Sequence, residues 1–266
     1  MIISNNRISF TIDMRLIEND ALQTGLDGAV APLDRFEVLE TLLSKRYGVV
    51  AEAADVKRFR SKKNIVFSFR VGNDHLVAKL FLTEFFTKEL EQLLLCAKNG
   101  VSVPTVLGAE DGVILMSYVA GRPLVDVLNE TFSVNTTKLL AEWYNEYHSV
   151  SGRIKGDPRL RNFIFDDSII GIDFEESSSG SWIKDIGGVA ASILDTDPIG
   201  DARKYQLVWN LFETYLSLSK LELTPHLKTV YSGVIANTLE KTALWRKSTE
   251  LLSLARTIRI SGLPQQ

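Results

Sequence analysis

The chain of 266 residues has one cysteine, and this scarcity excludes an internal disulfide framework. A single thiol is typical of a reducing compartment, and Cys96 lies in an apolar helical pattern that places it in the core. No apolar run approaches the ~20 residues that cross a bilayer, and no basic segment precedes an apolar one at the start. We therefore expect a cytoplasmic protein with no membrane partner.

An excess of charge of one sign is also lacking. The 30 Lys and Arg residues nearly balance 33 Asp and Glu residues, so no basic footprint for a nucleic-acid partner is expected. The sequence has no internal repeat and no low-complexity tract. With 45% hydrophobic residues, the composition is that of a globular protein with room for one large domain or two lobes.

Hydrophobic periodicity divides the first 119 residues into an N-terminal extension, 1–49, and a sheet lobe, 50–119. In the extension, alternation over 8–16 predicts a strand, and helical spacing predicts a helix from Leu33 to Tyr47. The sheet lobe is predicted to hold five antiparallel strands with one helix after the third. Its elements are expected at 56–59, 65–71, 76–82, the helix 83–98, and both sides of Asp111-Gly112.

Beyond residue 120 the pattern changes to helices, interrupted by two short strands, "NFIF" and "IIGID". A sheet lobe followed by a helical lobe over 120–266 is an α+β arrangement with a natural cleft. Helices are predicted at 137–149, 184–194, 201–218 and 225–256.

The stretch "GDPRLRNFIFDDSIIGIDFE" combines two carboxylates and an amide with these two strands. Asn162 follows Asp157 by five residues and begins the first strand, and Asp173 ends the second strand eleven residues later. A hairpin would bring Asn162 and Asp173 together, and amide and carboxylate oxygens are ligands that suit Mg²⁺. Asp157 would then be a free carboxylate beside the same metal site.

The segments "GDPRLRN" and "GIDFE" resemble the catalytic loop and the metal-binding motif of the protein-kinase-like superfamily. The likeness is greatest to the aminoglycoside- and choline-phosphotransferase branch, and it extends over about residues 50–195. It implies a bilobal fold, with a nucleotide-binding lobe at 50–119 and a catalytic and acceptor-binding lobe at 120–266. It also implies ATP and Mg²⁺ as cofactors.

The resemblance assigns the nucleotide to the sheet lobe. It implies that Lys79, on the third strand, binds the α- and β-phosphates and is held by Glu89 on the next helix. Glu91 is the alternative partner, although it points to a different helix face. Backbone groups of the hinge between the lobes would bind adenine, and the hinge residues are Met116, Ser117 and Val119.

The remaining roles implied by the resemblance belong to the later motifs. Asn162 and Asp173 would hold Mg²⁺, and Asp157 would orient the acceptor hydroxyl and take its proton. Arg159 stands where protein kinases often carry a lysine that touches the γ-phosphate. Asp185 would hold the catalytic loop through hydrogen bonds.

The sequence departs from the family pattern at three places. Lys155 stands where histidine or arginine is usual, and because that residue mostly supports the loop, we expect a small effect. The connection "RSKKN" has no glycine to cradle phosphates, which leaves either charge contacts from Lys62 and Lys63 or a loose loop. Glu175 replaces the glycine of D-F-G, an exchange that favours the phosphotransferase branch.

The segment from Asp173 to Asp185 is too short for the activation segment with which regulated protein kinases hold a peptide. We therefore predict transfer of the γ-phosphoryl group of ATP to a hydroxyl of a small molecule. Minimal kinases such as the RIO group also lack that segment, so a protein acceptor stays open, as does a pseudokinase that only binds partners. The sequence identifies neither the acceptor nor the oligomeric state.

Overall fold

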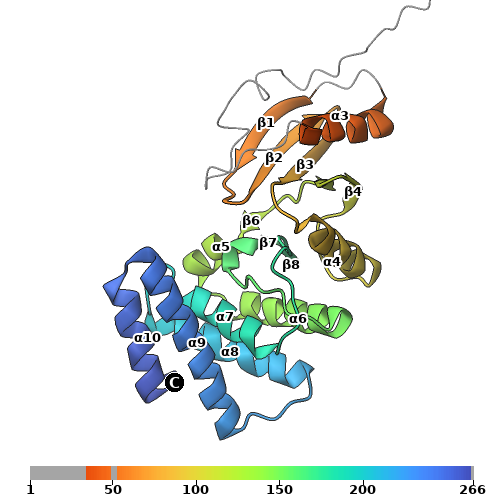
Figure 1. The fold of residues 1–266 in the computed structure, drawn as a ribbon. Coiled ribbons are helices and arrows are strands. Elements are labelled where there is room, and N and C mark those ends of the chain that lie inside the picture. Colours follow the sequence, from red (N-terminus) through yellow and green to blue (C-terminus); the bar gives the residue numbers. More distant parts are fainter. Residues whose placement is uncertain (1–33, 49–52, 265–266) are drawn as a thin grey trace, which may run out of the picture. The chain divides into compact units, whose positions relative to one another are not determined.

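The computed structural model describes residues 34–48 and 53–264, and the predicted strand over 8–16 lies outside them. The chain forms two compact units (Figure 1). The first takes in the described residues up to Leu93 together with Pro104–Val119, and the second takes in Leu94–Val103 and the chain from Ala120 onward. No helix among the described residues is long and apolar enough to cross a bilayer.

The first unit contains a five-stranded antiparallel sheet, as the sequence predicts. Its strands lie in the order β1-β2-β3-β5-β4. Strand β2 is rich in β-branched and aromatic residues, and a two-residue turn that includes Gly72, at φ 57°, joins it to β3. The bounds are β1 Ala53–Phe59, β2 Asn64–Val71, β3 Asp74–Phe81, β4 Val106–Glu110 and β5 Val113–Ser117.

Helix α3 (Asp34–Tyr47) covers one face of this sheet and ends before Gly48, as predicted. Its buried residues pack against Ala78 and Leu80 of β3 and their neighbours, each large apolar side chain contributing about 1.5–3 kcal/mol on burial. Side chains alternate along a strand, so Lys79 projects from the opposite face. Helix α4 (Phe86–Lys98) follows β3 and begins three residues later than predicted.

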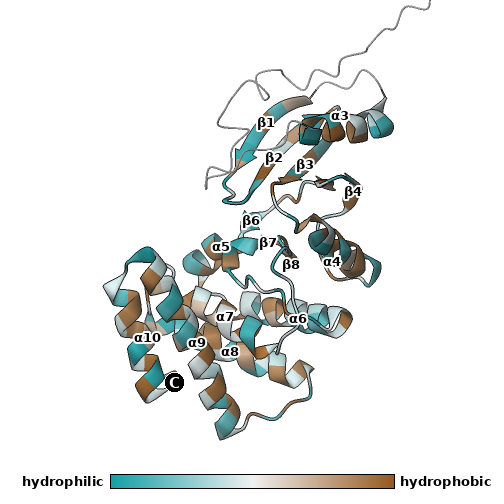
Figure 2. Cartoon of the chain, viewed as in Figure 1, coloured by the Kyte–Doolittle hydropathy of each residue, from teal (hydrophilic) through white to brown (hydrophobic). Residues whose placement is uncertain are grey.

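The second unit is mainly helical and is built around α7 (Ile183–Leu194), in which every residue except Lys184 is buried. Small residues let neighbouring segments pack closely against α7. A Cβ on Gly188, for example, would lie 2.3 Å from the ring of Pro158. Figure 2 shows both polar and apolar colours on the outer helices α9 and α10. The other elements are α5 Leu124–Thr131, α6 Val134–Ser151, α8 Ala202–Leu218, α9 Pro225–Arg246 and α10 Thr249–Ser261.

The predicted helix over 225–256 is wrong, because the chain breaks between α9 and α10. Lys247 adopts a left-handed conformation at φ 53°, and the Ser248 side chain accepts a hydrogen bond from the backbone N–H of Leu251. This serine cap starts a new helix where apolar periodicity alone indicated one continuous helix.

The predicted pair of short strands is confirmed as the hairpin of β7 (Phe163–Asp166) and β8 (Ser168–Gly171). The two-residue strand β6 (Arg122–Pro123), which the sequence pattern does not indicate, pairs with β7. Asn162 ends a short 3-10 helix, Leu160–Asn162, immediately before β7, and Asp173 lies two residues beyond β8. The hairpin thus brings the two predicted metal ligands to the same end.

Candidate active site

The catalytic loop predicted around Asp157 is held through its backbone by Asp185, near the start of α7. The carboxylate of Asp185 accepts hydrogen bonds from the backbone N–H groups of Lys155, at 2.5 Å, and Gly156, at 3.1 Å. The side chain of Asp185 is 1% exposed, and its Oδ2 also contacts His148 Nε2 at 3.0 Å. His148 Nδ1 in turn contacts the Tyr215 hydroxyl at 2.9 Å. These contacts confirm the hydrogen bonds predicted for Asp185.

Gly156 allows this loop to lie against the segment after Asp173. Gly156 has φ 87°, a conformation that residues with a side chain rarely adopt. A Cβ at this position would lie 2.2 Å from the carbonyl oxygen of Glu176. An antiparallel bridge between Ile154 and Ser178 joins the same two segments. The loop with Asp157 and the segment with Asp173 are therefore neighbours along their backbones.

Asp157 is bound by Arg159 in this structure. The guanidinium Nε lies 2.5 Å from Asp157 Oδ1, and Nη2 bonds to Oδ2, so that the ion pair is bidentate. Burial raises the pKa of the Asp157 carboxyl, but the hydrogen bonds and charge of Arg159 outweigh burial and hold that pKa below its usual value. The side chain of Asp157 is therefore a carboxylate, as a proton acceptor must be.

Asn162 is 6% exposed, and its amide nitrogen donates to the carbonyl oxygen of Asp157 at 3.2 Å. This contact fixes the orientation of the Asn162 amide. The backbone carbonyl of Asn162 accepts a hydrogen bond from the N–H of Ile172 at 3.0 Å. The structure thus places Asn162 beside the residue that precedes Asp173. Asp173 itself has φ 63°, an uncommon conformation for a residue other than glycine.

Lys155 contacts both the loop of Asp157 and the segment of Asp173, which the sequence did not indicate. Its side chain is fully buried, and Nζ donates to the carbonyl oxygens of Asp173 at 2.8 Å and Asp157 at 3.4 Å. The ammonium lies 5.4 Å from the ring centroid of Phe163 and 5.1 Å from that of Phe174. We expected the replacement of the usual histidine or arginine by Lys155 to have a small effect. In the structure, the Lys155 side chain links the two motifs. Neither the burial nor the two partners could be read from the spacing.

In the first unit, Lys79 Nζ lies 2.6 Å from Glu89 Oε2, and both side chains are buried, at 7% and 2% exposure. The alternative partner, Glu91, is exposed. The ammonium of Lys79 also lies 4.9 Å from the ring centroid of Phe81. The contact predicted between strand β3 and helix α4 is therefore made by Glu89.

The predicted adenine-binding residues lie at the end of β5. Met116 and Ser117 belong to the strand, and Val119 follows it. The backbone N–H of Ser117 donates to the carbonyl oxygen of Thr105, and the backbone N–H of Thr105 donates to the Ser117 hydroxyl. The next residue, Tyr118, stacks on His75 with ring centroids 3.7 Å apart. The sequence did not indicate this stack, because the two rings are 43 residues apart along the chain.

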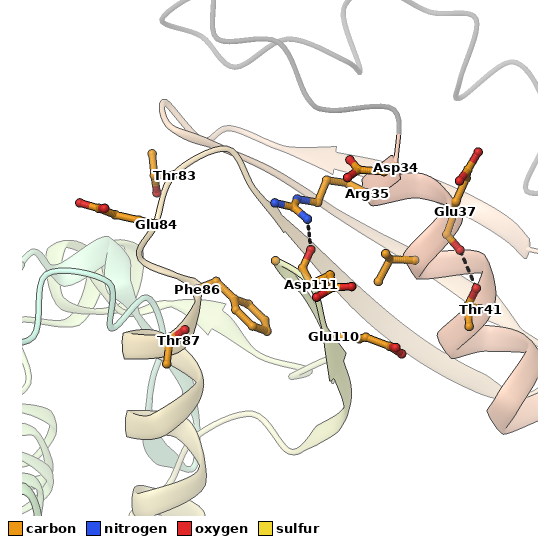
Figure 3. A pocket seen from close by; sticks show the side chains of 12 residues that line it. Asp34, Arg35, Glu37, Thr41, Thr83, Glu84, Phe86, Thr87, Glu110 and Asp111 are labelled. Carbon is orange, nitrogen blue, oxygen red and sulfur yellow. Dashed lines mark hydrogen bonds between the residues drawn. The ribbon is translucent and has the colours of Figure 1, made fainter.

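A cavity of about 660 Å³ lies elsewhere in the first unit, between α3, the β3–α4 connection and the β4–β5 turn (Figure 3). Arg35 of α3 donates a hydrogen bond to the carbonyl oxygen of Asp111 in that turn. Gly112 has φ 78°, a conformation that residues with a side chain rarely adopt, and its Cα faces the Arg35 guanidinium closely enough that a Cβ would lie 2.7 Å from it. None of the predicted nucleotide-binding residues lines this cavity.

Residues 41–175 match the model of the RIO domain family. The comparison with curated proteins gives no match. Many solved structures are similar, and one is a choline/ethanolamine kinase family protein from Mesorhizobium loti, with 14% identity and a TM-score of 0.57. That alignment covers 85% of this chain and 92% of the other.

Two further structures have the same TM-score of 0.57. An amicoumacin kinase in complex with AMP-PNP and Ca²⁺ is 12% identical, over 86% of this chain and 95% of that one. A macrolide 2′-phosphotransferase from Brachybacterium faecium is 11% identical, over 86% and 99%. At such identities the likeness shows the fold, which is the bilobal protein-kinase-like α+β fold that the motifs predict.

Proposed function

The chain belongs to the RIO domain family, and we propose that it is an ATP-dependent phosphotransferase that moves the γ-phosphoryl group to a hydroxyl of a small molecule. The observation that carries the proposal is the arrangement around Asp157. Its loop is fixed through the backbone by Asp185, while Asn162 and the segment of Asp173 lie side by side. A fixed carboxylate beside two oxygen ligands is what positioning and electrostatic catalysis of phosphoryl transfer require.

Lys79 is proposed to bind the α- and β-phosphates. Its buried ion pair with Glu89 supports this role, because the pair sets the direction of the ammonium on β3. The backbone at Met116, Ser117 and Val119 is proposed to bind adenine. ATP is the nucleotide we propose for this site.

The residues present fit a divalent metal ion of the Mg²⁺ kind. Asn162 supplies the amide oxygen, because its amide nitrogen is directed to the carbonyl oxygen of Asp157, and Asp173 supplies a carboxylate. Oxygen ligands in small number, completed by water and substrate phosphates, suit Mg²⁺. When bound there, the ion neutralises charge on the triphosphate. Asn162 and Asp173 would hold it.

Asp157 is proposed to orient the acceptor hydroxyl and take its proton as the hydroxyl oxygen bonds to the γ-phosphorus. The bond between the γ-phosphorus and the β,γ-bridging oxygen breaks in the same step, and ADP leaves with that oxygen. Arg159 holds the carboxylate in this structure. We propose that its guanidinium moves to the γ-phosphate when ATP binds, which frees Asp157 for the acceptor.

The acceptor is proposed to be small because Asp173 and α7 are separated by nine residues, too few for a segment that holds a peptide. The RIO domain match favours a second candidate, a minimal protein kinase with a protein acceptor. A pseudokinase is disfavoured, since Lys79, Asp157 and the two metal ligands are all present.

A panel of hydroxylated metabolites and aminoglycosides, screened for ATP consumption with Mg²⁺, tests the proposal. Asp157→Ala is the blank, and Asp166→Ala, which removes an exposed carboxylate from the hairpin, is the matched control. We expect consumption with at least one acceptor by the wild type and the control but not by the blank. Labelled phosphate on casein or on the chain itself would favour the protein kinase. Absence of both consumption and Mg–ATP stabilisation would contradict a phosphotransferase.

A further inference from the structure

We propose that Lys155 is a positioning residue that holds the loop of Asp157 against the segment of Asp173, a role that rests on the phosphotransferase function proposed above. One ammonium group donates to backbone carbonyls in both segments, at 2.8 Å in Asp173 and 3.4 Å in Asp157. The two carbonyls belong to the residues proposed to take the proton and to hold the metal. Lys155 therefore ties together the positions of the two carboxylates.

The ammonium of Lys155 is buried close to two aromatic rings. The residue is fully buried, and its ammonium lies near the rings of both Phe163 and Phe174. Burial of an ammonium is unfavourable unless hydrogen bonds compensate it, and an unbranched apolar chain would fill this space without that penalty. What the ammonium adds is a donor that reaches both carbonyls. The hydrogen bonds of the ammonium thus link the two segments, which packing of an apolar chain would not do.

The two linked segments hold conformations that need such support. Gly156 and Asp173 both have positive φ, at 87° and 63°. For Asp173 this conformation is unfavourable, because its side chain crowds the backbone. The residue lies beyond the end of β8, where the strand ladder no longer fixes the chain. The ammonium of Lys155 donates to the carbonyl of Asp173 and so orients the peptide group that joins Asp173 to Phe174.

The second buried lysine of this unit provides a matched control. Lys204 is 1% exposed, and its Nζ donates to the carbonyl oxygen of Thr196 at 2.5 Å and to the Thr196 hydroxyl at 2.9 Å. Lys204→Met makes the same chemical change as Lys155→Met. Its partner follows the end of α7 and carries none of the proposed catalytic groups. A general effect of removing a buried ammonium should appear in both variants.

The test compares the full chain with Lys155→Met, Lys155→Arg and Lys204→Met. Hydrogen–deuterium exchange is measured first, because it does not depend on activity. In Lys155→Met we expect faster exchange in both 154–162 and 172–178, while Lys204→Met leaves these segments unchanged. Lys155→Arg should restore slow exchange, since a guanidinium has enough donors for both carbonyls.

Kinetics with ATP and an acceptor from the screen give the second readout. In Lys155→Met we expect kcat to fall about 10- to 100-fold and the Mg²⁺ concentration for half-maximal rate to rise about tenfold, the usual size of such outer-shell effects. The KM for the acceptor should stay near that of the wild type. For Lys204→Met, kcat per folded enzyme and the Mg²⁺ requirement should both equal those of the wild type.

Two results of the exchange measurement would overturn the proposal. One is wild-type exchange in both segments of Lys155→Met, and the other is faster exchange confined to one of them. An inactive wild type with the expected exchange pattern would instead refute the phosphotransferase function and leave the link by Lys155 supported. An active Lys155→Met enzyme with an unchanged Mg²⁺ requirement would show that the link does not position Asp173.

Discussion

The two units fix their candidate site residues by different means. In the first unit, the ammonium of Lys79 is directed by another side chain, that of Glu89, across 2.6 Å. In the second, the loop of Asp157 is held through its backbone, by the carboxylate of Asp185 and the ammonium of Lys155. A side-chain pair fixes one group, whereas backbone bonds fix the path of the whole loop. Substitutions in the loop network should therefore cost more than substitutions in the pair.

The largest effect is expected from Asp185→Ala. It removes the acceptor of two backbone N–H groups, those of Lys155 and Gly156, in a site that is 1% exposed. Each unsatisfied buried donor costs about 1–3 kcal/mol, so the free energy of unfolding should fall by about 3–5 kcal/mol. Urea unfolding measures this loss. We also expect activity to fall about 100-fold, because the loop no longer holds Asp157 in place.

Asp185→Asn is the control for this change, because it keeps one oxygen acceptor in the same volume. It should lose less than half as much unfolding free energy as the alanine variant. An alanine variant with the denaturation midpoint of the wild type would show that other contacts hold the loop. The contrast between the two units would then be unfounded.

The next effect concerns Gly156, where the loop lies against the segment of Glu176. Gly156→Ala places a Cβ on a residue of positive φ, and this Cβ would lie 2.2 Å from a carbonyl oxygen. We therefore expect the free energy of unfolding to fall by about 3 kcal/mol. Gly152→Ala is the matched control, because φ is 60° but nothing lies within 4 Å of its Cβ. It should cost about 1 kcal/mol. Equal losses in thermal or urea unfolding would show that the close approach is not tight.

The sequence alone predicts several features in both units. The two short apolar runs "NFIF" and "IIGID" predicted the hairpin, because strand pairing follows from local pattern and turn chemistry. The strand position of Lys79 and the helix position of Glu89 also follow from periodicity, and the structure confirms their contact. These features depend on residues that are near in sequence or on repeating patterns.

The features that the sequence did not predict depend on burial and on side-chain direction. Lys155 reads as a polar residue in a loop, yet it is fully buried and spans two segments. Arg159 pairs with Asp157 in the structure, a contact that the spacing did not predict, and its role at the γ-phosphate stays a prediction. The break at Ser248 was missed because a serine cap is a local hydrogen bond, which apolar periodicity does not register. Nor does periodicity determine which of several partners a long side chain reaches.

Glu89→Gln tests the other side of the comparison. The amide keeps an acceptor for Lys79 but removes the charge, so we expect the free energy of unfolding to fall by about 2 kcal/mol, the size of a charged hydrogen bond. The KM for ATP should rise, because the direction of the ammonium is less fixed. Glu91→Gln, on the exposed face of α4, is the control and should change neither quantity. A larger loss than in Asp185→Ala would reverse the comparison.

The smallest effect is expected in the connection between β1 and β2, which has no glycine to surround phosphates with N–H groups. Lys62 is exposed there, and a single exposed charge contributes about 0.2–1 kcal/mol, so Lys62→Ala should raise the KM for ATP no more than about fivefold. Added salt should weaken nucleotide binding in the wild type more than in the variant, because salt screens exposed charges. The KM for ATP in low and high salt measures both effects. An equal salt dependence in the two proteins would show that Lys62 does not contact the nucleotide. Lys79 would then be the proposed phosphate-binding lysine of this unit that remains.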